Sequence, residues 1–353
     1  MTADQHSTQA LAALSTFSAR LGSDITRTQG AGGNTSIKIG EVMWVKASGT
    51  WLAHARERDI MVPLETAPLV AALDAGDPRA EKATDFVVAA LNPSGLRPSI
   101  EASVHASIPQ RVVAHFHCVN TLAHAVCSDA EAELTKIFAD RLPHLRWAMI
   151  PYRRPGTPLA RAIAEVRADA PDILVLANHG LVVCGDSVAE TEARVEEVTA
   201  ALALPRRSAP AADIDWLEAT ARRLGEFGLP DDPECHDIAL DPAALAMAMG
   251  GSLYPDHVIF LGTKLGTLDD SGNLALSETG ESAKLVVIPG KGVIVRSDMT
   301  PGGHAMVRCL AEVLARIPAG KSLNYLSAEQ EYELTHWEAE KYRQSLDRQA
   351  TKG

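Results

Sequence analysis

The sequence ILVLANHGLVVCG, at residues 173–185, decides the fold more than any other stretch of the chain. Two runs of branched apolar residues flank a short polar segment, which predicts two buried strands that meet at a tight turn. Gly180 allows such a turn because glycine adopts backbone angles that other residues avoid. A second run, RVVAHFH at residues 111–117, also predicts a strand.

Outward from these strands, helical and extended patterns alternate irregularly. Residues 6–22 carry apolar side chains at helical spacing, and a hairpin is predicted from Thr35–Lys38 and Val42–Ala47 with its turn at Gly40. A helix interrupted near Gly76 is predicted over residues 67–91. This mixture indicates an α/β protein with a central mixed or largely antiparallel sheet.

A change in composition at residues 205–213, PRRSAPAAD, predicts a linker between two domains, 1–205 and 206–353. The second domain is expected to be an α/β extension that ends in a helix. Helices are predicted there over 213–227, 241–249, 301–316 and Ser327–Asp347, and strands over 257–262 and 284–297.

The composition excludes several classes of protein. The formal net charge of −12 argues against a general nucleic-acid surface, although a local anion site remains possible. No run of 18 apolar residues predicts a membrane helix, and Met1–Ala10 lacks the apolar core of a secretory signal. The five cysteines form no CxxC pair, which favours reduced thiols in the cytoplasm.

Three histidines form a candidate metal site. His115 and His117 are two residues apart on a predicted strand, so their side chains share one face. His179, at the end of a buried strand, is the natural third ligand. Three protein ligands leave a coordination position open for a substrate, as in catalytic sites. An HxH pair alone is a weak signal. His105, His124 and His144 are expected to be surface or supporting groups.

Glu101 lies shortly before the HxH pair, in PSIEASVH. A carboxylate beside a metal can act as a ligand or as a general base, and an enediolate intermediate needs both a base and a Lewis acid. The alternative is a glutamate in the first turn of a helix, where the helix dipole favours it.

Two glycine-containing loops are candidate anion sites. GAGGNTS, at residues 30–36, could surround an anion with backbone N–H groups and the side chains of Asn34 and Thr35. It matches neither a P-loop nor a dinucleotide fingerprint, and a plain turn is the alternative. KASGT places Ser48 and Gly49 after a strand. Lys46 beside them either adds charge or is an exposed strand lysine.

These motifs, taken in order, resemble the class II aldolase/adducin family over about residues 10–205. They are GAGGNTS, KASGT, PSIE before HFH, and NHG. The later stretches YPDHVIFLG and WEAEKYRQSL are similar to the aldolase half of bifunctional rhamnulose-1-phosphate aldolase/short-chain dehydrogenase proteins.

The resemblance implies a three-layer α/β/α domain with a mostly antiparallel sheet. It also implies a zinc ion, with Mn²⁺ or Co²⁺ as alternatives, and a homotetramer with sites at subunit interfaces. By position, three histidines correspond to the metal ligands and Glu101 to the general acid/base. The implied ligands are His115, His117 and His179, and the implied phosphate pocket is Asn34, Ser48, Gly49 and Ser99.

One position departs from the family pattern. Sugar-phosphate aldolases of the family usually have a second serine where this chain has Ile100. The missing hydroxyl donor costs about 1 kcal/mol of phosphate binding, although the fused aldolases share this feature. The family also implies a tyrosine that protonates the aldehyde oxygen. The sequence does not choose among Tyr325, Tyr332 and Tyr342.

Three functions remain open. The first is retro-aldol cleavage of a ketose 1-phosphate such as rhamnulose 1-phosphate, through a metal-stabilised enediolate. The second is decarboxylation of a 3-oxo acid, whose carboxylate would be met by Lys46, Arg153 or Arg154. The third is an adducin-like interaction protein without catalysis, which typically lacks the histidine set. The expected partners are a small sugar or sugar-phosphate substrate and further copies of the chain, with no nucleic acid or membrane.

Overall fold

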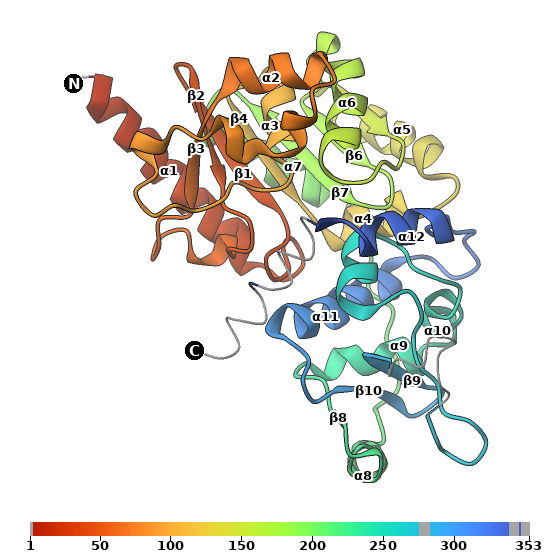
Figure 1. Ribbon diagram of the computed structural model, residues 1–353. Coiled ribbons are helices and arrows are strands. Elements are labelled where there is room, and N and C mark those ends of the chain that lie inside the picture. The colour runs from red at the N-terminus through yellow and green to blue at the C-terminus, as the bar shows by residue number, and fades with distance from the viewer. Residues whose placement is uncertain (1–2, 275–282, 339–345, 347–353) are drawn as a thin grey trace. The chain divides into compact units, whose positions relative to one another are not determined.

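The computed structural model describes residues 3–274, 283–338 and 346 (Figure 1). The chain forms two compact units. The first consists of Met1–Thr121 with Glu131–Leu202, and the second of Leu122–Ala130 with Ala203–Gly353. The predicted domain boundary after residue 205 stays a prediction, because compactness does not show that a unit folds on its own.

A seven-stranded sheet forms the centre of the first unit. Its strand order is β3-β2-β1-β4-β7-β6-β5, and only β5 and β6 pair in parallel. The strands are β1 (Asn34–Ile39), β2 (Val42–Lys46), β3 (Met61–Glu65), β4 (Val112–Phe116), β5 (Trp147–Ile150), β6 (Ile173–Leu176) and β7 (Gly180–Gly185). The prediction of a mostly antiparallel central sheet is confirmed.

Helices cover both faces of this sheet. On one face α2 (Thr66–Asp74), α3 (Ala102–Ser107) and α6 (Thr157–Val166) contact one another and share an apolar core with the strands. On the other, α1 (Ala3–Ser23) and α7 (Val188–Ala201) contact each other and the strands β1, β4 and β7. The predicted three layers are therefore present (Figure 1). Of the two helices that follow β4 in the chain, α4 (Val119–Ala125) spans the boundary between the two units and α5 (Ala130–Arg141) lies almost entirely in the first.

Gly22 lies near the end of helix α1, where the helix meets another segment of backbone. Helix α1 continues to Ser23, and a Cβ atom on Gly22 would lie 2.2 Å from the backbone nitrogen of Ala53. Ala53 belongs to the short helix η1 (Leu52–His54). Glycine is needed at this position because two backbones approach too closely for any side chain.

The helix predicted over residues 67–91 is largely wrong. Helix α2 ends at Asp74, and Gly76 follows with a left-handed φ of 71°. The side chain of Asp77 then accepts a hydrogen bond from the Arg79 N–H and starts a new, tighter turn. The segment continues as 3₁₀ turns, η2 (Pro78–Glu81), η3 (Ala83–Phe86) and η4 (Ala89–Leu91).

The second unit has its own small sheet and core, which confirms the predicted α/β extension. Strands β8 (Phe227–Gly228), β10 (Gly292–Arg296) and β9 (Leu285–Ile288) pair antiparallel in that order. Leu217 and Phe227 pack with apolar side chains of the sheet. The helical elements are α8 (Ile214–Leu224), η6 (Pro233–His236), α9 (Asp237–Leu240), α10 (Pro242–Ala248), α11 (Pro301–Arg316) and α12 (Ala328–Thr335).

The strand predicted over residues 257–262 is wrong. His257–Leu261 form a turn of π-helix, η7, which ends at Gly262 with a φ of 91°. All five side chains are buried, so the segment has no polar face from which a helical period could be recognised.

The predicted last helix starts where expected but is shorter within the described residues. Ser327 and Gln330 form a capping box at the start of α12, which ends at Thr335. Most of the predicted continuation to Asp347 lies outside the described residues, as does the candidate Tyr342.

The described helices and cysteines bear on the expectations from the sequence about membrane helices and free thiols. Among the described residues, no helix combines the length and the apolar character needed to cross a bilayer. The five cysteines are all buried, and none takes part in a disulfide.

Candidate metal centre

Three histidines from the middle of the sheet converge on one point. His115 lies on β4, His117 directly follows this strand, and His179 lies in the turn between β6 and β7. All three side chains are buried, and one nitrogen of each lies within 4.8 Å of the others. The structure thus brings together the three residues that the sequence predicts as metal ligands.

The turn that carries His179 depends on the residues on either side of it. Asn178 has a left-handed φ of 53°, which asparagine tolerates better than most residues. A Cβ atom on Gly180 would lie 2.8 Å from the carbonyl oxygen of Phe116 and 3.1 Å from Cδ2 of His117. Glycine therefore lets this turn approach β4 closely enough for the histidines to meet.

Glu101 completes the cluster. It lies at the N-terminal end of α3 and is only 5% exposed. Its Oε2 is 3.3 Å from His115 Nε2, and its Oε1 is 3.5 Å from His179 Nε2. Oε2 accepts a hydrogen bond of 2.9 Å from Asn34 Nδ2, whereas the buried Oε1 accepts none from the described residues.

The environment of Glu101 favours its charged form. Burial acts to raise the pKa of this carboxyl, but positive charge on His115 and His179, with smaller contributions from Asn34 and His117, lowers it to about 2. A cation held by the histidines would act in the same direction.

The donor set fits a divalent metal. His115 Nδ1 lies 3.1 Å from the carbonyl oxygen of Leu181, which can only accept, so Nδ1 carries a proton and Nε2 faces the cluster. When Nε2 releases its own proton, its lone pair can bind a metal. This Nε2 is 3.3 Å from His117 Nε2. Two nitrogens bound tetrahedrally at about 2.0–2.1 Å from one zinc ion lie roughly 3.3–3.4 Å apart. The Oε1 atom of Glu101 offers a fourth donor.

Ser48 and Ser99, which are both predicted to bind phosphate, lie on neighbouring segments. The Ser48 N–H donates to the carbonyl of Arg97, and the Ser99 N–H donates to the carbonyl of Lys46, each at 2.9 Å. The Ser99 hydroxyl also accepts from the Glu101 N–H at 3.2 Å. Backbone pairing thus brings the KASGT loop next to the segment that carries Ser99 and Glu101.

Three further residues of the loops have different surroundings: Gly49, Lys46 and Thr35. Gly49 has a left-handed φ of 75°. Lys46 is buried rather than exposed and donates to the carbonyl oxygens of Ala31 and Thr50, so it ties the glycine loop to KASGT. The Thr35 hydroxyl lies 2.6 Å from Ser18 Oγ of α1. Since neighbouring strand residues point to opposite faces, the Thr35 side chain lies on the face of the sheet opposite to that of Asn34. The structure does not bring its side chain to the others.

The other candidate groups have partners elsewhere. Arg154 pairs with Glu81 at 2.9 Å, and Arg153 donates to the carbonyl of Tyr152. In the second unit the Tyr325 hydroxyl donates to the carbonyl of Met247 at 3.0 Å, and Tyr332 is 62% exposed.

His105 lies beside the site, behind Asn34. It is fully buried, and its ring contacts both Asn34 Oδ1 and Ser36 Oγ. Of the two positions predicted for it, the surface one is wrong, whereas a supporting one agrees with these contacts. The signal in the sequence is the spacing of four residues between Glu101 and His105, which places both on the same side of a helix turn.

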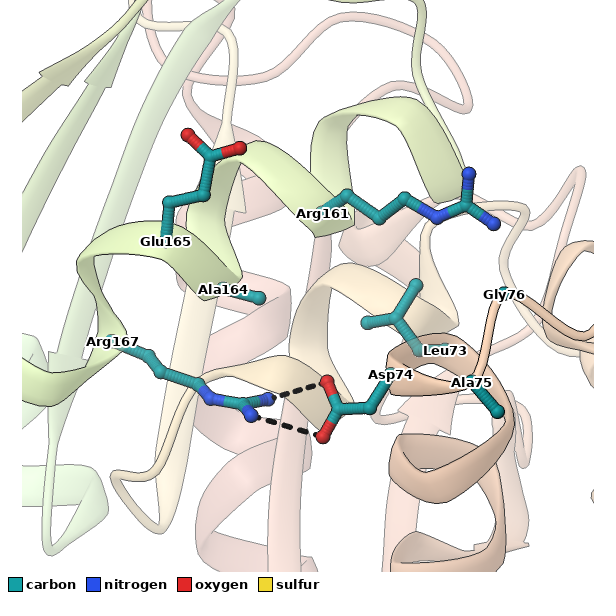
Figure 2. Close-up of a pocket in the computed structure, with 8 residues that line it drawn as sticks. All are labelled: Leu73, Asp74, Ala75, Gly76, Arg161, Ala164, Glu165 and Arg167. Atoms are coloured by element: carbon teal, nitrogen blue, oxygen red, sulfur yellow. Dashed lines mark hydrogen bonds and ion pairs between the residues drawn. The ribbon is translucent and has the colours of Figure 1, made fainter.

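A shallow hollow of about 430 Å³ lies elsewhere in the first unit, at the ends of α2 and α6 (Figure 2). Both Asp74 oxygens accept from the Arg167 guanidinium, at 3.0 and 2.9 Å. Asp74 and Arg167 neutralise each other, and no predicted site residue lines the hollow.

Comparison with known proteins identifies the family of the chain. Residues 13–204 match the class II aldolase and adducin N-terminal domain. The chain belongs to this family, and its remaining residues form an additional region.

Two curated relatives are 32% identical to parts of the chain. One is "Uncharacterized oxidoreductase YuxG" of Bacillus subtilis, over 181 residues, which are 47% of this chain and 25% of that protein. Another is "3-oxo-tetronate 4-phosphate decarboxylase" of Escherichia coli K12, over 116 residues, which are 30% of this chain and 53% of that protein. The matches thus span a quarter and about half of these relatives.

Solved structures of the family are also similar. The N-terminal class II aldolase domain of a conserved protein from Thermoplasma acidophilum is 25% identical, with a TM-score of 0.46 over 54% of this chain and 90% of that one. A sugar-phosphate aldolase from Thermotoga maritima is 16% identical, with a TM-score of 0.45 over 56% of this chain and 93% of that one.

Proposed function

We propose that this member of the class II aldolase and adducin family is a metal-dependent lyase. His115, His117 and His179 would hold the metal, and Glu101 would transfer the proton. The observation that carries the proposal is the convergence of the three buried imidazoles on a carboxylate whose Oε1 accepts no hydrogen bond from the described residues. Three imidazole ligands favour Zn²⁺, with Mn²⁺ or Co²⁺ as alternatives.

The chain's own groups suit proton transfer next to a carbonyl. The lowered pKa of Glu101 keeps it ionised, so it can accept a proton from the substrate and return it to the product. Asn34 holds Oε2 and leaves Oε1 to act. A metal bound by the histidines would supply a Lewis acid that stabilises negative charge developing on a substrate oxygen.

The preferred reaction is retro-aldol cleavage of a ketose 1-phosphate similar to rhamnulose 1-phosphate, giving dihydroxyacetone phosphate and lactaldehyde. The resemblance of residues 10–205 to class II aldolases supports it. The phosphate would be met by Ser48, Gly49 and Ser99, whose loops are adjacent, and by Asn34 and the backbone of Thr35. Ile100 removes one hydroxyl from this pocket.

A second candidate is decarboxylation of a 3-oxo acid. The observation that favours it is the 32% identity to the E. coli protein named 3-oxo-tetronate 4-phosphate decarboxylase. The same histidines and Glu101 would serve, because both reactions generate negative charge beside a carbonyl. Release of carbon dioxide, as opposed to an aldehyde, separates the two. A non-catalytic adducin-like role is disfavoured by the complete histidine set.

Assembly and location remain part of the proposal. We expect a homotetramer in the cytoplasm with a small-molecule substrate and no nucleic-acid partner. Sedimentation velocity of the purified chain tests the assembly, and a monomer at micromolar concentration would contradict it.

The decisive experiment removes one ligand. In His117→Ala, bound metal measured by mass spectrometry should fall far below one per chain, and turnover of phosphorylated ketoses and 3-oxo acids should fall by about 10³-fold or more, since a metal contributes several kcal/mol to catalysis. His144→Ala is the matched control, because this exposed histidine pairs with Glu197 and is not one of the three clustered histidines. Full metal content and activity in His117→Ala would refute the proposal.

A further inference from the structure

Four buried side chains form a continuous hydrogen-bonded row that ends at the candidate metal centre. Ser36 Oγ lies 2.7 Å from His105 Nδ1, and His105 Nε2 contacts Asn34 Oδ1. Asn34 Nδ2 then donates to Glu101 Oε2 at 2.9 Å. Each of the four residues is at most 5% exposed, so water cannot easily replace any of these bonds.

The ionised carboxylate of Glu101 sets the donor and the acceptor of every hydrogen bond in this row. An ionised carboxylate only accepts, so the Asn34 group that faces Glu101 must be the NH₂ group. Asn34 then presents its oxygen to His105, whose Nε2 must carry the proton. In a neutral ring Nδ1 is an acceptor, and the Ser36 hydroxyl must donate to it.

The position of the His105 ring is itself fixed by the fold. Lys38 Nζ donates to the carbonyl oxygens of His105, Ile108 and Gln110, at 3.0, 2.6 and 2.9 Å, and so holds the C-terminal end of α3. Burial, together with the charge of His115, lowers the pKa of His105 to about 3, so its ring is neutral under ordinary conditions.

The strand register places Asn34 beside the metal ligands. Asn34 is the direct partner of His115 across β1 and β4, and Ser36 is the partner of Val113 two residues on. Residues 34 and 36 therefore point to one face of the sheet, the face that α3 covers. Glu101 and His105, at either end of α3, meet Asn34 from above this face.

We propose that His105 is a positioning residue that acts through Asn34 on Glu101. By donating from Nε2 it fixes the orientation of the Asn34 amide. This amide holds Glu101 Oε2 and turns Oε1 towards the histidine cluster. The inference rests on the proposed role of Glu101 for its catalytic meaning, whereas the hydrogen-bond directions stand without it.

The competing explanation is that His105 is only a buried histidine with satisfied hydrogen bonds. That role requires both ring nitrogens to have partners but sets no direction for the proton. The tautomer of His105 therefore separates the two explanations in a way that stability cannot.

The first test is ¹⁵N NMR of the full chain labelled with ¹⁵N-histidine, after metal removal with EDTA. His105→Gln identifies the His105 signals by their loss. The expected result is a neutral ring with the proton on Nε2 and no proton on Nδ1. A proton on Nδ1 would overturn the proposal, because Asn34 could not then present its NH₂ group to Glu101.

The second test compares two substitutions by titration with Co²⁺. His105→Phe removes the donor and keeps the ring, whereas His105→Gln places a carboxamide N–H close to the position of Nε2. Loss of such a supporting contact costs about 10–100-fold in metal affinity. We expect this loss in His105→Phe and recovery of most of the affinity in His105→Gln.

Equal cobalt affinity in wild type and both variants would overturn the positioning role. An equal loss of cobalt affinity in His105→Phe and His105→Gln would also overturn it, provided that the urea unfolding midpoints of both variants match that of wild type. Failure of the wild-type protein to bind cobalt would instead refute the proposed metal-dependent function. The NMR result would then still decide the direction of the hydrogen bonds.

Discussion

Glu101 in the first unit and Glu312 in the second are both buried, at 5% and 2% exposed, yet their partners differ. Glu312 Oε1 accepts from Arg308 Nε at 2.9 Å, and its Oε2 accepts from Arg316. Arg206 approaches Oε2 at 3.5 Å. Glu101 faces imidazoles and one amide, and its Oε1 accepts no hydrogen bond from the described residues.

The difference indicates what each carboxylate is for. Arginine is always charged, so a glutamate surrounded by arginines is neutralised permanently and serves to hold helices together. Imidazoles can release their protons and bind a metal, so a glutamate among histidines can respond to a ligand. Burial alone therefore does not mark a functional carboxylate. The chemistry of its partners does.

The largest expected effect is on catalysis at Glu101. Glu101→Gln keeps the shape but removes the group that moves the proton, so turnover should fall by about 10²–10⁴-fold. The free energy of unfolding should fall as well, since the lowered pKa of Glu101 means that the folded state favours its charged form over a neutral one. Steady-state kinetics and urea unfolding on the same preparation measure both. Wild-type turnover in Glu101→Gln would contradict a catalytic role for Glu101 and so the functional difference from Glu312.

The corresponding change in the second unit should affect stability alone. Glu312→Ala leaves Arg308 and Arg316 without their shared carboxylate, and the free energy of unfolding should fall by about 3 kcal/mol, at the low end for a broken buried pair. Bound metal and turnover should be unchanged at temperatures where the variant is folded. Loss of metal in the folded variant would contradict a purely structural role.

Gly180→Ala probes the geometry of the histidine turn. The added methyl group meets the carbonyl oxygen of Phe116, so we expect a loss of about 1–3 kcal/mol in stability and a clear loss of bound metal. Gly228→Ala is the control, because a methyl group there meets nothing within 4 Å. Unchanged metal binding in Gly180→Ala would show that the turn tolerates displacement.

The smallest expected effect is on the stability of the protein at acidic pH. Burial opposes ionisation of Glu312, but Arg316 and Arg308 lower its pKa below 4.5. The lowered pKa stabilises the folded state above pH 4.5, and this contribution is lost as the pH falls below that value. Glu312→Gln should therefore lose less stability than wild type between pH 5 and pH 3, as measured by urea unfolding. Parallel losses in the two proteins would argue against this linkage.

Sequence patterns predicted the strands that carry the histidines, because long apolar runs around NHG and HFH have no other stable place than the interior. They also predicted the C-terminal α/β region. They failed at His257–Leu261, where a buried π-turn lacks a polar face, and after Asp74, where Gly76 takes a left-handed conformation and Asp77 caps a new 3₁₀ turn.

The candidate site was predictable to the extent that local spacing determines it. HxH spacing places His115 and His117 on one face of the sheet. The position of His179 at the end of a buried strand makes it the natural third ligand, and the resemblance to a family makes that set specific. The contact of His105 with Asn34 depends on the packing of α3 over β1, which no short-range pattern encodes. The burial of Lys46 by two loop carbonyls is equally a property of the assembled fold.

The pairing of Asn34 with His115 across β1 and β4 also bears on how such chains can change length. An insertion at the hairpin turn around Gly40, where added atoms meet open space, leaves that register intact. A single residue added directly after Asn34, with the rest of β1 held in register, would turn Asn34 to the face of α1. We therefore expect related chains to differ in length at the Gly40 turn and to keep the length of β1.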